Sequence, residues 1–313
     1  MKLVISIDVE EEGLFSGDYP RTPPGVTNVA ELGRLEFIPR EFGFPLTLLV
    51  SHHAALDPGA CRVLASWRET HGAEIGVHLH PWNTPPFADL THPEPIPSEL
   101  LPVSLLRDKL AHLVHQVRRS LGAEPRSFRM GRLDWGPKLM ALLPELGLRV
   151  DSSIAPLTAK SSRPEDFLAP ADPFFLPGLP GRRVLEAPLT LVPVLPGTAR
   201  ATYNLSRALP DAWGRRLRDR FRYLGAAGLQ PAWFPLASMQ LAARLHRRRG
   251  GQVLTMSFHS SELKPGATRL FPTEEAVGRL VEKIRTFFTW LVATGPVEGA
   301  TLSDLWKVYG GEL

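Results

Sequence analysis

The chain has 313 residues, of which 43% are hydrophobic, 22% charged and 8% aromatic. This composition is typical of a folded globular protein, and it excludes a disordered or a fibrous chain. The single cysteine, Cys61, excludes a framework of internal disulfides and a cysteine-based zinc finger. No apolar run reaches the roughly 18 residues that a membrane-spanning helix needs. The apolar run 3–7 is shorter than a signal peptide requires, so a cytoplasmic location is expected.

The charges of the chain are close to balanced, with 36 basic and 32 acidic residues and a net charge of +4. Two segments, 215–222 and 244–249, are rich in arginine. We interpret both as solvated helix faces, and we therefore predict no nucleic-acid partner. The alternative is that these segments attract an acidic or phosphorylated substrate, or a membrane surface.

Short apolar runs alternate with longer amphipathic segments along the chain. This alternation predicts an α/β protein built on a parallel sheet or barrel. The long stretch 155–250 adds helical segments and predicts an inserted cap or subdomain within one domain that spans 1–313. The predicted strands cover 3–7, 45–50, 74–80, 127–130, 148–151 and 253–258, and the predicted helices cover 58–70, 99–121, 136–146, 204–224, 232–249 and 273–294.

Ionisable side chains stand at the ends of several predicted strands, and the carboxyl ends of parallel strands converge on one rim. Asp8 and Glu10 end the first strand, and His78 and His80 end the third. Residues i and i+2 of a strand point to the same side, so each pair can face one ion. Two histidines and one carboxylate make a three-ligand metal site with open positions, and they leave the second carboxylate free to act as a base. The competing interpretation of 8–12 is a solvated acidic turn.

Further polar and aromatic residues follow the same strands. His259 ends the last predicted strand; opposite a metal it is a candidate general acid, although a core or capping histidine has the same pattern. Arg129 ends the fourth strand, where it can hold a carboxylate ionised or be an ordinary surface arginine. Asp151 ends the fifth strand and forms either a cap or turn, or a contact to the catalytic histidine or to substrate hydroxyls. Trp82 lies in a rim loop, where its ring can stack on a sugar or pack locally.

These segments, in this order, resemble the polysaccharide deacetylases of the NodB-homology type, a family of carbohydrate esterases. The acidic motif of that family is similar to 6–10, its histidine motif to 74–82, its arginine–glycine motif to 128–131 and its late histidine motif to 254–259. The common family pattern has two adjacent aspartates, and histidines separated by three residues, whereas here one residue stands between the members of each pair. The histidine motifs resemble those of a bacterial subgroup, the WalW-like proteins found with surface-glycan genes.

The resemblance implies a distorted (β/α) barrel of about seven parallel strands that removes N-acetyl groups from a sugar with a divalent metal, usually zinc. By the pattern of the family, Glu10, His78 and His80 hold the metal and Asp8 is the base, and an exchange of roles between Asp8 and Glu10 stays open. His259 is expected to protonate the leaving amine.

Arg129 is expected to hold the catalytic aspartate, and Trp82, Gly131 and Asp151 are expected to contact the substrate. The expected partner is therefore an N-acetylated carbohydrate, and the sequence predicts no particular oligomeric state. Two other functions fit the same residues. Non-haem iron(II) oxygenases also bind their metal through two histidines and one carboxylate, and a catalytically inactive barrel could only bind a glycan.

Overall fold

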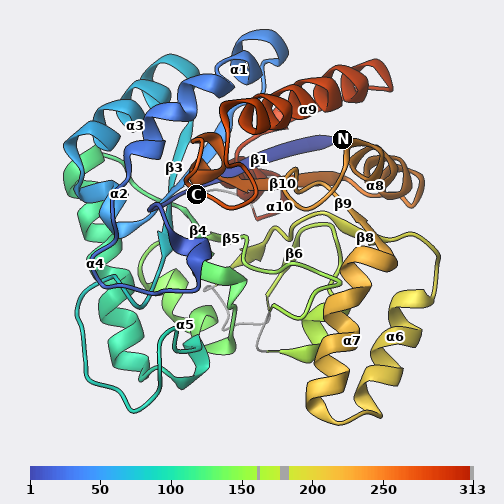
Figure 1. The fold of residues 1–313 in the computed structure, drawn as a ribbon, viewed down its shortest axis with the longest axis horizontal. Helices are drawn as coiled ribbons and strands as arrows, with labels where there is room; N and C mark the ends of the chain where they lie inside the picture. The colour runs from blue at the N-terminus through green and yellow to red at the C-terminus, as the bar shows by residue number, and fades with distance from the viewer. Residues whose placement is uncertain (161–162, 177–182, 311–313) are drawn as a thin grey trace.

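A curled sheet forms the centre of the molecule (Figure 1); this computed structural model describes residues 1–160, 163–176 and 183–310. Within these residues the strands pair in the order β10-β1-β2-β3-β4-β5-β7-β6, and β11 also pairs with β1. All pairs are parallel except β6 with β7. This arrangement confirms the predicted α/β class and parallel sheet. The strands are β1 (Lys2–Val9), β2 (Leu46–Val50), β3 (Glu74–Leu79), β4 (Ser127–Met130), β5 (Val150–Asp151), β6 (Phe174–Phe175), β7 (Leu185–Glu186), β10 (Val253–His259) and β11 (Glu298–Ala300).

The central strands are buried on both faces, which explains why their sequences are continuous apolar runs. The register of the strands then decides which polar side chains share a face. Asp8 of β1 lies beside His259 of β10, and His78 of β3 lies beside Arg129 of β4. Because register partners in parallel strands project to the same side of the sheet, the fold brings these side chains towards one rim.

The two sides of the curled sheet approach each other at Thr190. Its backbone N–H donates to the carbonyl oxygen of Thr255 in β10 (3.0 Å), and the N–H of Thr255 donates to Thr190 Oγ1 (2.7 Å). The neighbouring Leu189 donates to the carbonyl of Ile154, beyond β5 (3.0 Å). The sheet is therefore a half-barrel whose open side is bridged through Thr190, which agrees with the predicted distorted barrel.

Helices pack around the outside of the sheet (Figure 1). Side-chain caps start four of them: Ser51 accepts from the N–H of Ala54, Asp57 from that of Ala60 and Thr273 from that of Ala276, and Thr301 caps the last helix. Among the helices in the described ranges, none has both the length and the apolar character that crossing a membrane demands. The helices are α1 (Phe37–Phe42), α2 (His52–Leu56), α3 (Pro58–His71), α4 (Val103–Leu121), α5 (Pro137–Glu145), α6 (Thr198–Arg207), α7 (Asp211–Leu224), α8 (Leu236–Arg248), α9 (Glu274–Ala293) and α10 (Leu302–Tyr309).

The prediction of one helix over 204–224 is wrong, because the structure has two helices there, α6 and α7, packed as a hairpin (Figure 1). Pro210 separates them: a proline has no N–H to donate and its ring clashes with the preceding turn, so it disfavours a helix interior, and here it stands directly before the first residue of α7. A two-stranded antiparallel sheet of β8 (Leu191–Pro193) and β9 (Ala226–Gly228) joins the hairpin to the half-barrel. The interpretation of 155–250 as a cap or subdomain stays a prediction.

Candidate active site

Side chains from three strand ends line one cavity of about 640 Å³. Asp8 and Glu10 come from the end of β1, His78 and His80 from the end of β3, and His259 from the end of β10. The first four are at most 4% exposed, so the cavity reaches them while bulk water is largely excluded. The structure thus brings together the acidic pair, the histidine pair and the late histidine that the sequence singled out.

Three of these side chains point one ligand atom each at a common centre. Glu10 Oε2 lies 3.4 Å from His78 Nε2 and 3.3 Å from His80 Nε2, and the two ring nitrogens are 3.0 Å apart. Ligands of a tetrahedral zinc ion, at bond lengths of about 2.0–2.1 Å, are spaced by about 3.3 Å. Glu10 Oε1 is buried without a hydrogen-bond partner among the described residues. Donor types, spacing and the orphaned oxygen therefore fit a divalent metal ion.

The second ring nitrogen of each histidine is held by a neighbour. His78 Nδ1 lies 3.0 Å from the carbonyl oxygen of Arg129, and His80 Nδ1 lies 3.0 Å from Glu11 Oε2. A carbonyl oxygen can only accept, so His78 donates from Nδ1 and presents a lone pair at Nε2. Burial opposes the ionisation of Glu11, but the charge of His80 and hydrogen bonds from His80 and Ser51 lower the pKa of Glu11 to about 2. Both imidazoles are therefore oriented as metal ligands need to be.

Arg129 fixes the Asp8 carboxylate from the interior. Arg129 is fully buried, and its Nη1 donates to Asp8 Oδ1 at 2.6 Å. The other guanidinium N–H groups donate to Ser6 Oγ, Ser257 Oγ, and the carbonyl and hydroxyl oxygens of Ser152, at 2.7–2.8 Å. Burial raises the pKa of Asp8, but the Arg129 charge and the neighbouring histidines more than offset this, so the pKa lies below its usual range. The Asp8 carboxylate is thus held ionised and in one orientation.

His259 stands on the other side of Asp8. Its Nδ1 lies 2.8 Å from Glu262 Oε1, and its Nε2 lies 3.7 Å from Asp8 Oδ2. Burial opposes its protonation, but the negative charges of Glu10 and Glu262 raise the pKa of His259 to about 10. Its side chain is 21% exposed, far more than that of Asp8, so a cationic imidazole faces the cavity.

Trp82 and Gly131 support the histidine pair. The Trp82 ring stacks on His80, with ring centroids 4.5 Å apart and planes 16° apart, and it lines the cavity as well. A Cβ added at Gly131 would lie 2.4 Å from His80 Cδ2 and 2.8 Å from the carbonyl oxygen of Leu79. Glycine is therefore needed here so that the backbone can approach the His80 ring closely.

The structure does not bring Asp151 to the cavity, although a substrate contact was expected. Asp151 is fully buried, accepts a hydrogen bond from Ser153 and pairs with Glu186 in β7. Its register partner in β4 is Phe128, whose side chain lies on the sheet face opposite to that of Arg129. Strand alternation instead places the next residue, Ser152, against the arginine.

Sequence reasoning missed Glu11, which holds His80, and Glu262, which holds His259. A signal existed for Glu262, because it stands three residues after His259 at the start of a short helical turn, the spacing of a capping box. Glu11 lies two residues beyond Val9, the last residue of β1, where the alternation of strand side chains no longer predicts direction.

A half-barrel of parallel strands with metal-ligand side chains at its carboxyl rim defines a distorted (β/α) barrel protein with a candidate metal centre. No model of a protein family matches the sequence, and no curated protein matches it either. The WalW-like assignment therefore stays a prediction.

Solved structures share this fold over almost the whole chain. A protein from Pseudomonas aeruginosa PAO1 described as a candidate polysaccharide deacetylase is similar with a TM-score of 0.60 and 14% identity, covering 100% of this chain and 92% of that one. The PuuE allantoinase gives 0.58 and 14%, with 100% and 92% covered. A candidate polysaccharide deacetylase from Mycobacterium smegmatis gives 0.56 and 17%, with 98% and 89% covered. At these identities the similarity establishes the fold.

Proposed function

We propose that this protein is a metal-dependent deacetylase that hydrolyses the N-acetyl group of a sugar or glycan precursor. The observation that carries the proposal is the convergence of Glu10, His78 and His80 on one point, beside an ionised Asp8 and a cationic His259 in one cavity. The parallel half-barrel also separates this site from the antiparallel folds on which two-histidine oxygenases usually sit.

Glu10, His78 and His80 would hold the metal ion, for which zinc is the first candidate given two imidazoles and one carboxylate. When bound, such an ion supplies Lewis acidity, which polarises an acyl carbonyl and lowers the pKa of a coordinated water towards about 7. Glu10 is the better ligand of the two acids, because its Oε2 lies 3.3–3.4 Å from both ring nitrogens, whereas Asp8 Oδ2 lies 3.9 Å from His78 Nε2.

Asp8 would then act as the general base. It takes a proton from the attacking water as the new C–O bond forms, and Arg129 keeps the carboxylate ionised and aimed into the cavity. His259 gives its Nε2 proton to the amine nitrogen as the C–N bond breaks, while Glu262 holds the ring through Nδ1. The products are one acetate and one free amine. Arg129 touches Asp8 and not the substrate, so it is a positioning residue.

The aromatic side chains of Tyr19, Trp82 and Trp233 line the same cavity. Aromatic rings present apolar faces and, in tyrosine and tryptophan, a polar edge, a combination that suits the C–H faces and hydroxyl groups of a sugar. The solved structures of similar fold carry names of both deacetylases and an allantoinase. The choice of a sugar therefore rests on the aromatic lining of this cavity and on the motif resemblance.

The test is an assay of acetate released from a panel of N-acetyl sugars by the zinc-loaded full-length protein, with metal content measured on the same samples. We expect His78→Ala to lose both metal and turnover. The matched variant His259→Ala should keep its metal and lose about 10²–10⁴-fold in kcat, because only the proton donor is removed. Unchanged metal content in His78→Ala, or sugar binding with no acetate release and with oxygen consumption, would contradict the proposal.

A further inference from the structure

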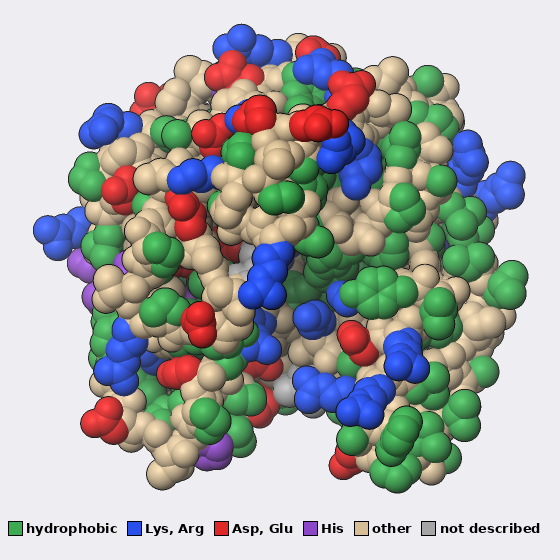
Figure 2. Space-filling view, in the orientation of Figure 1, with side chains coloured by type: hydrophobic (Ala, Val, Ile, Leu, Met, Phe, Trp, Pro, Cys, Tyr) green, Lys and Arg blue, Asp and Glu red, His purple; other side chains and the backbone are tan. Residues whose placement is uncertain are grey.

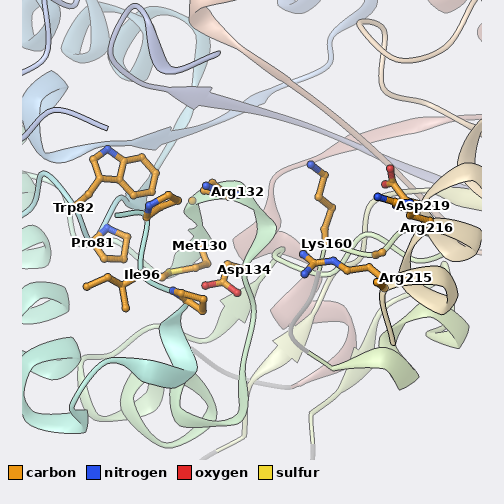
Figure 3. A pocket seen from close by; sticks show the side chains of 15 residues that line it. Pro81, Trp82, Ile96, Met130, Arg132, Asp134, Lys160, Arg215, Arg216 and Asp219 are labelled. Carbon is orange, nitrogen blue, oxygen red and sulfur yellow. The ribbon is translucent and has the colours of Figure 1, made fainter. Parts of the chain in front are cut away.

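A second cavity, of about 570 Å³, lies beside the candidate active site. The two cavities share Trp82, Arg132 and Lys160 among their lining residues. One wall of the second cavity is the loop after β3 together with the end of β4, and the opposite wall is α7 (Figure 3). A molecule whose acyl group reaches the metal centre can therefore extend into the second cavity.

Cationic side chains outnumber carboxylates on the walls of the second cavity. Figure 2 shows Lys and Arg side chains gathered around a hollow on this face of the molecule. The second cavity has two carboxylates, and each already has a partner. Asp134 accepts a hydrogen bond from the backbone N–H of Ser98 at 2.6 Å, and Asp219 lies 4.0 Å from Arg222. The cationic side chains that line one or both cavities are Arg132, Lys160, Arg215, Arg216, Arg222 and Arg269.

Several of these cations make no direct ion pair. Within the part of the chain that the structure describes, Lys160, Arg215 and Arg269 make no side-chain hydrogen bond or ion pair, and Arg222 Nε is buried without a partner. Desolvation and the positive charges of Arg222, Arg132 and Arg215 lower the pKa of Lys160, and the negative charge of Asp219 offsets only part of this. Like charges held together in this way repel one another, and a bound anion would relieve that repulsion.

The arginines of α7 differ by the face on which they lie, which argues against a uniformly solvated helix. Arg215 and Arg216 line the second cavity, and Arg222 lines the first. Arg218 instead donates to Ser206 of α6 at 2.9 Å, and Arg220 is exposed and lines neither cavity. Three arginines of α7, Arg215, Arg216 and Arg222, thus line the cavities at the active site.

We infer that the second cavity binds a phosphate or diphosphate group carried by the substrate, placed between Lys160 and the α7 arginines while the acylated sugar occupies the metal-side cavity. This inference rests on the proposed function and adds the substrate class. Arginine forks and a lysine ammonium match phosphate oxygens through charge-assisted hydrogen bonds. In Figure 3, Lys160 and Arg215 lie in the gap between the two walls, where such a group would sit. A compact, highly charged group suits a cavity of about 570 Å³ better than an extended polyanion does.

Two sources of a sugar diphosphate share this chemistry, a nucleoside diphosphate sugar and a lipid-linked sugar diphosphate. The α6–α7 hairpin also exposes Leu205, Leu209 and Trp213, which are 56%, 38% and 62% exposed. These exposed apolar side chains could contact the lipid of a lipid-linked substrate, whereas a nucleotide sugar would not need them. The two sources are therefore tested separately, and both require the same cationic residues.

The experiment uses the full-length, metal-loaded protein and its Lys160→Gln and Arg215→Gln variants. Arg220→Gln is the matched control, because it removes the same charge from α7 at a position that lines neither cavity. Calorimetry measures the Kd of uridine diphosphate N-acetylglucosamine. Acetate release measures kcat/KM for that compound, for a polyprenyl-diphosphate N-acetyl sugar and for neutral N-acetylglucosamine.

We expect each cavity variant to raise the Kd of the nucleotide sugar about tenfold, and to lower the preference for either diphosphate substrate over the neutral sugar by a similar factor. Arg220→Gln should match the wild type in both measurements, and the preferred arm identifies the source. Equal Kd values in the wild type and both cavity variants would overturn the inference. That result would be found if the metal alone held the nucleotide sugar. Absence of acetate release from every sugar would count against the proposed function, whereas the Kd comparison would still decide the phosphate site.

Discussion

At the scale of single residues, the hydrogen bonds at the ring nitrogens that face away from the metal centre determine whether each histidine can bind a metal. An imidazole can bind a metal at Nε2 only if that nitrogen has no proton, and the hydrogen bond at Nδ1 decides where the proton lies. The Arg129 carbonyl does this for His78, and the Glu11 carboxylate does it for His80. The carboxylate adds a negative charge, so Glu11 also makes His80 a more basic ligand.

Replacing Glu11 with glutamine should weaken metal binding and leave the fold intact. The amide keeps the size of the carboxylate but removes its charge beside His80, and loss of such a supporting partner costs about 10–100-fold in metal affinity. Competition with a chromogenic chelator measures this affinity. The neighbouring Glu12→Gln variant is the control, because Glu12 contacts Lys264 and Thr27 instead of a histidine. Equal zinc affinity in Glu11→Gln and Glu12→Gln would refute the role given to Glu11.

The residues that sequence reasoning found at the site are those whose direction follows from strand periodicity. Asp8 with Glu10, and His78 with His80, are spaced by two at the ends of buried strands, and this spacing predicts a shared side. Glu11 could not be found in the same way, because β1 ends at Val9 and the loop geometry beyond it sets the direction of the side chain. Lys160 lies in a loop without periodicity, so only the folded chain places it beside the arginines of α7.

At the scale of elements, the register of β5 decides the environment of Asp151. Its partners are Phe128 in β4 and Glu186 in β7, so two carboxyl groups face each other in the interior. Burial and the negative charge of Asp151 raise the pKa of Glu186 well above its usual value, and burial raises that of Asp151. The pair is therefore a structural element that folds with Glu186 protonated.

Glu186→Gln should make the protein more stable at pH 8 and change its stability little at pH 5. The folded wild type keeps a proton on Glu186 that the unfolded chain loses above about pH 4.5, so its stability falls as the pH rises beyond that value. A neutral amide removes this dependence and can still accept from the Ile154 N–H, as Glu186 does at 3.0 Å. Thermal unfolding at both pH values checks this, with exposed Glu275→Gln as the control. A variant less stable than the wild type at pH 8 would disprove the protonated pair.

At the scale of the whole molecule, the segment between β7 and β10 both bridges the half-barrel and supplies the cationic wall of α7. The alternation of strands and helices predicted the parallel sheet, because each βα unit carries its own apolar pattern. It did not predict β6 to β9, which are two or three residues long and too short for any periodicity. The bridge at Thr190 depends on a contact 65 residues away in the chain, which no local pattern encodes.

Thr190→Val tests whether this bridge stabilises the molecule as a whole. Valine keeps the shape of threonine but removes the hydroxyl oxygen that accepts from the buried N–H of Thr255. An unsatisfied buried donor costs about 1–3 kcal/mol, and the free energy of unfolding in urea should fall by that amount. Hydrogen exchange should quicken at the β10 amides, whereas metal content should persist because β1 and β3 supply the ligands. Thr286→Val, an exposed substitution on α9, should change neither quantity, and unfolding free energies that agree between the two variants would rule out a stabilising bridge.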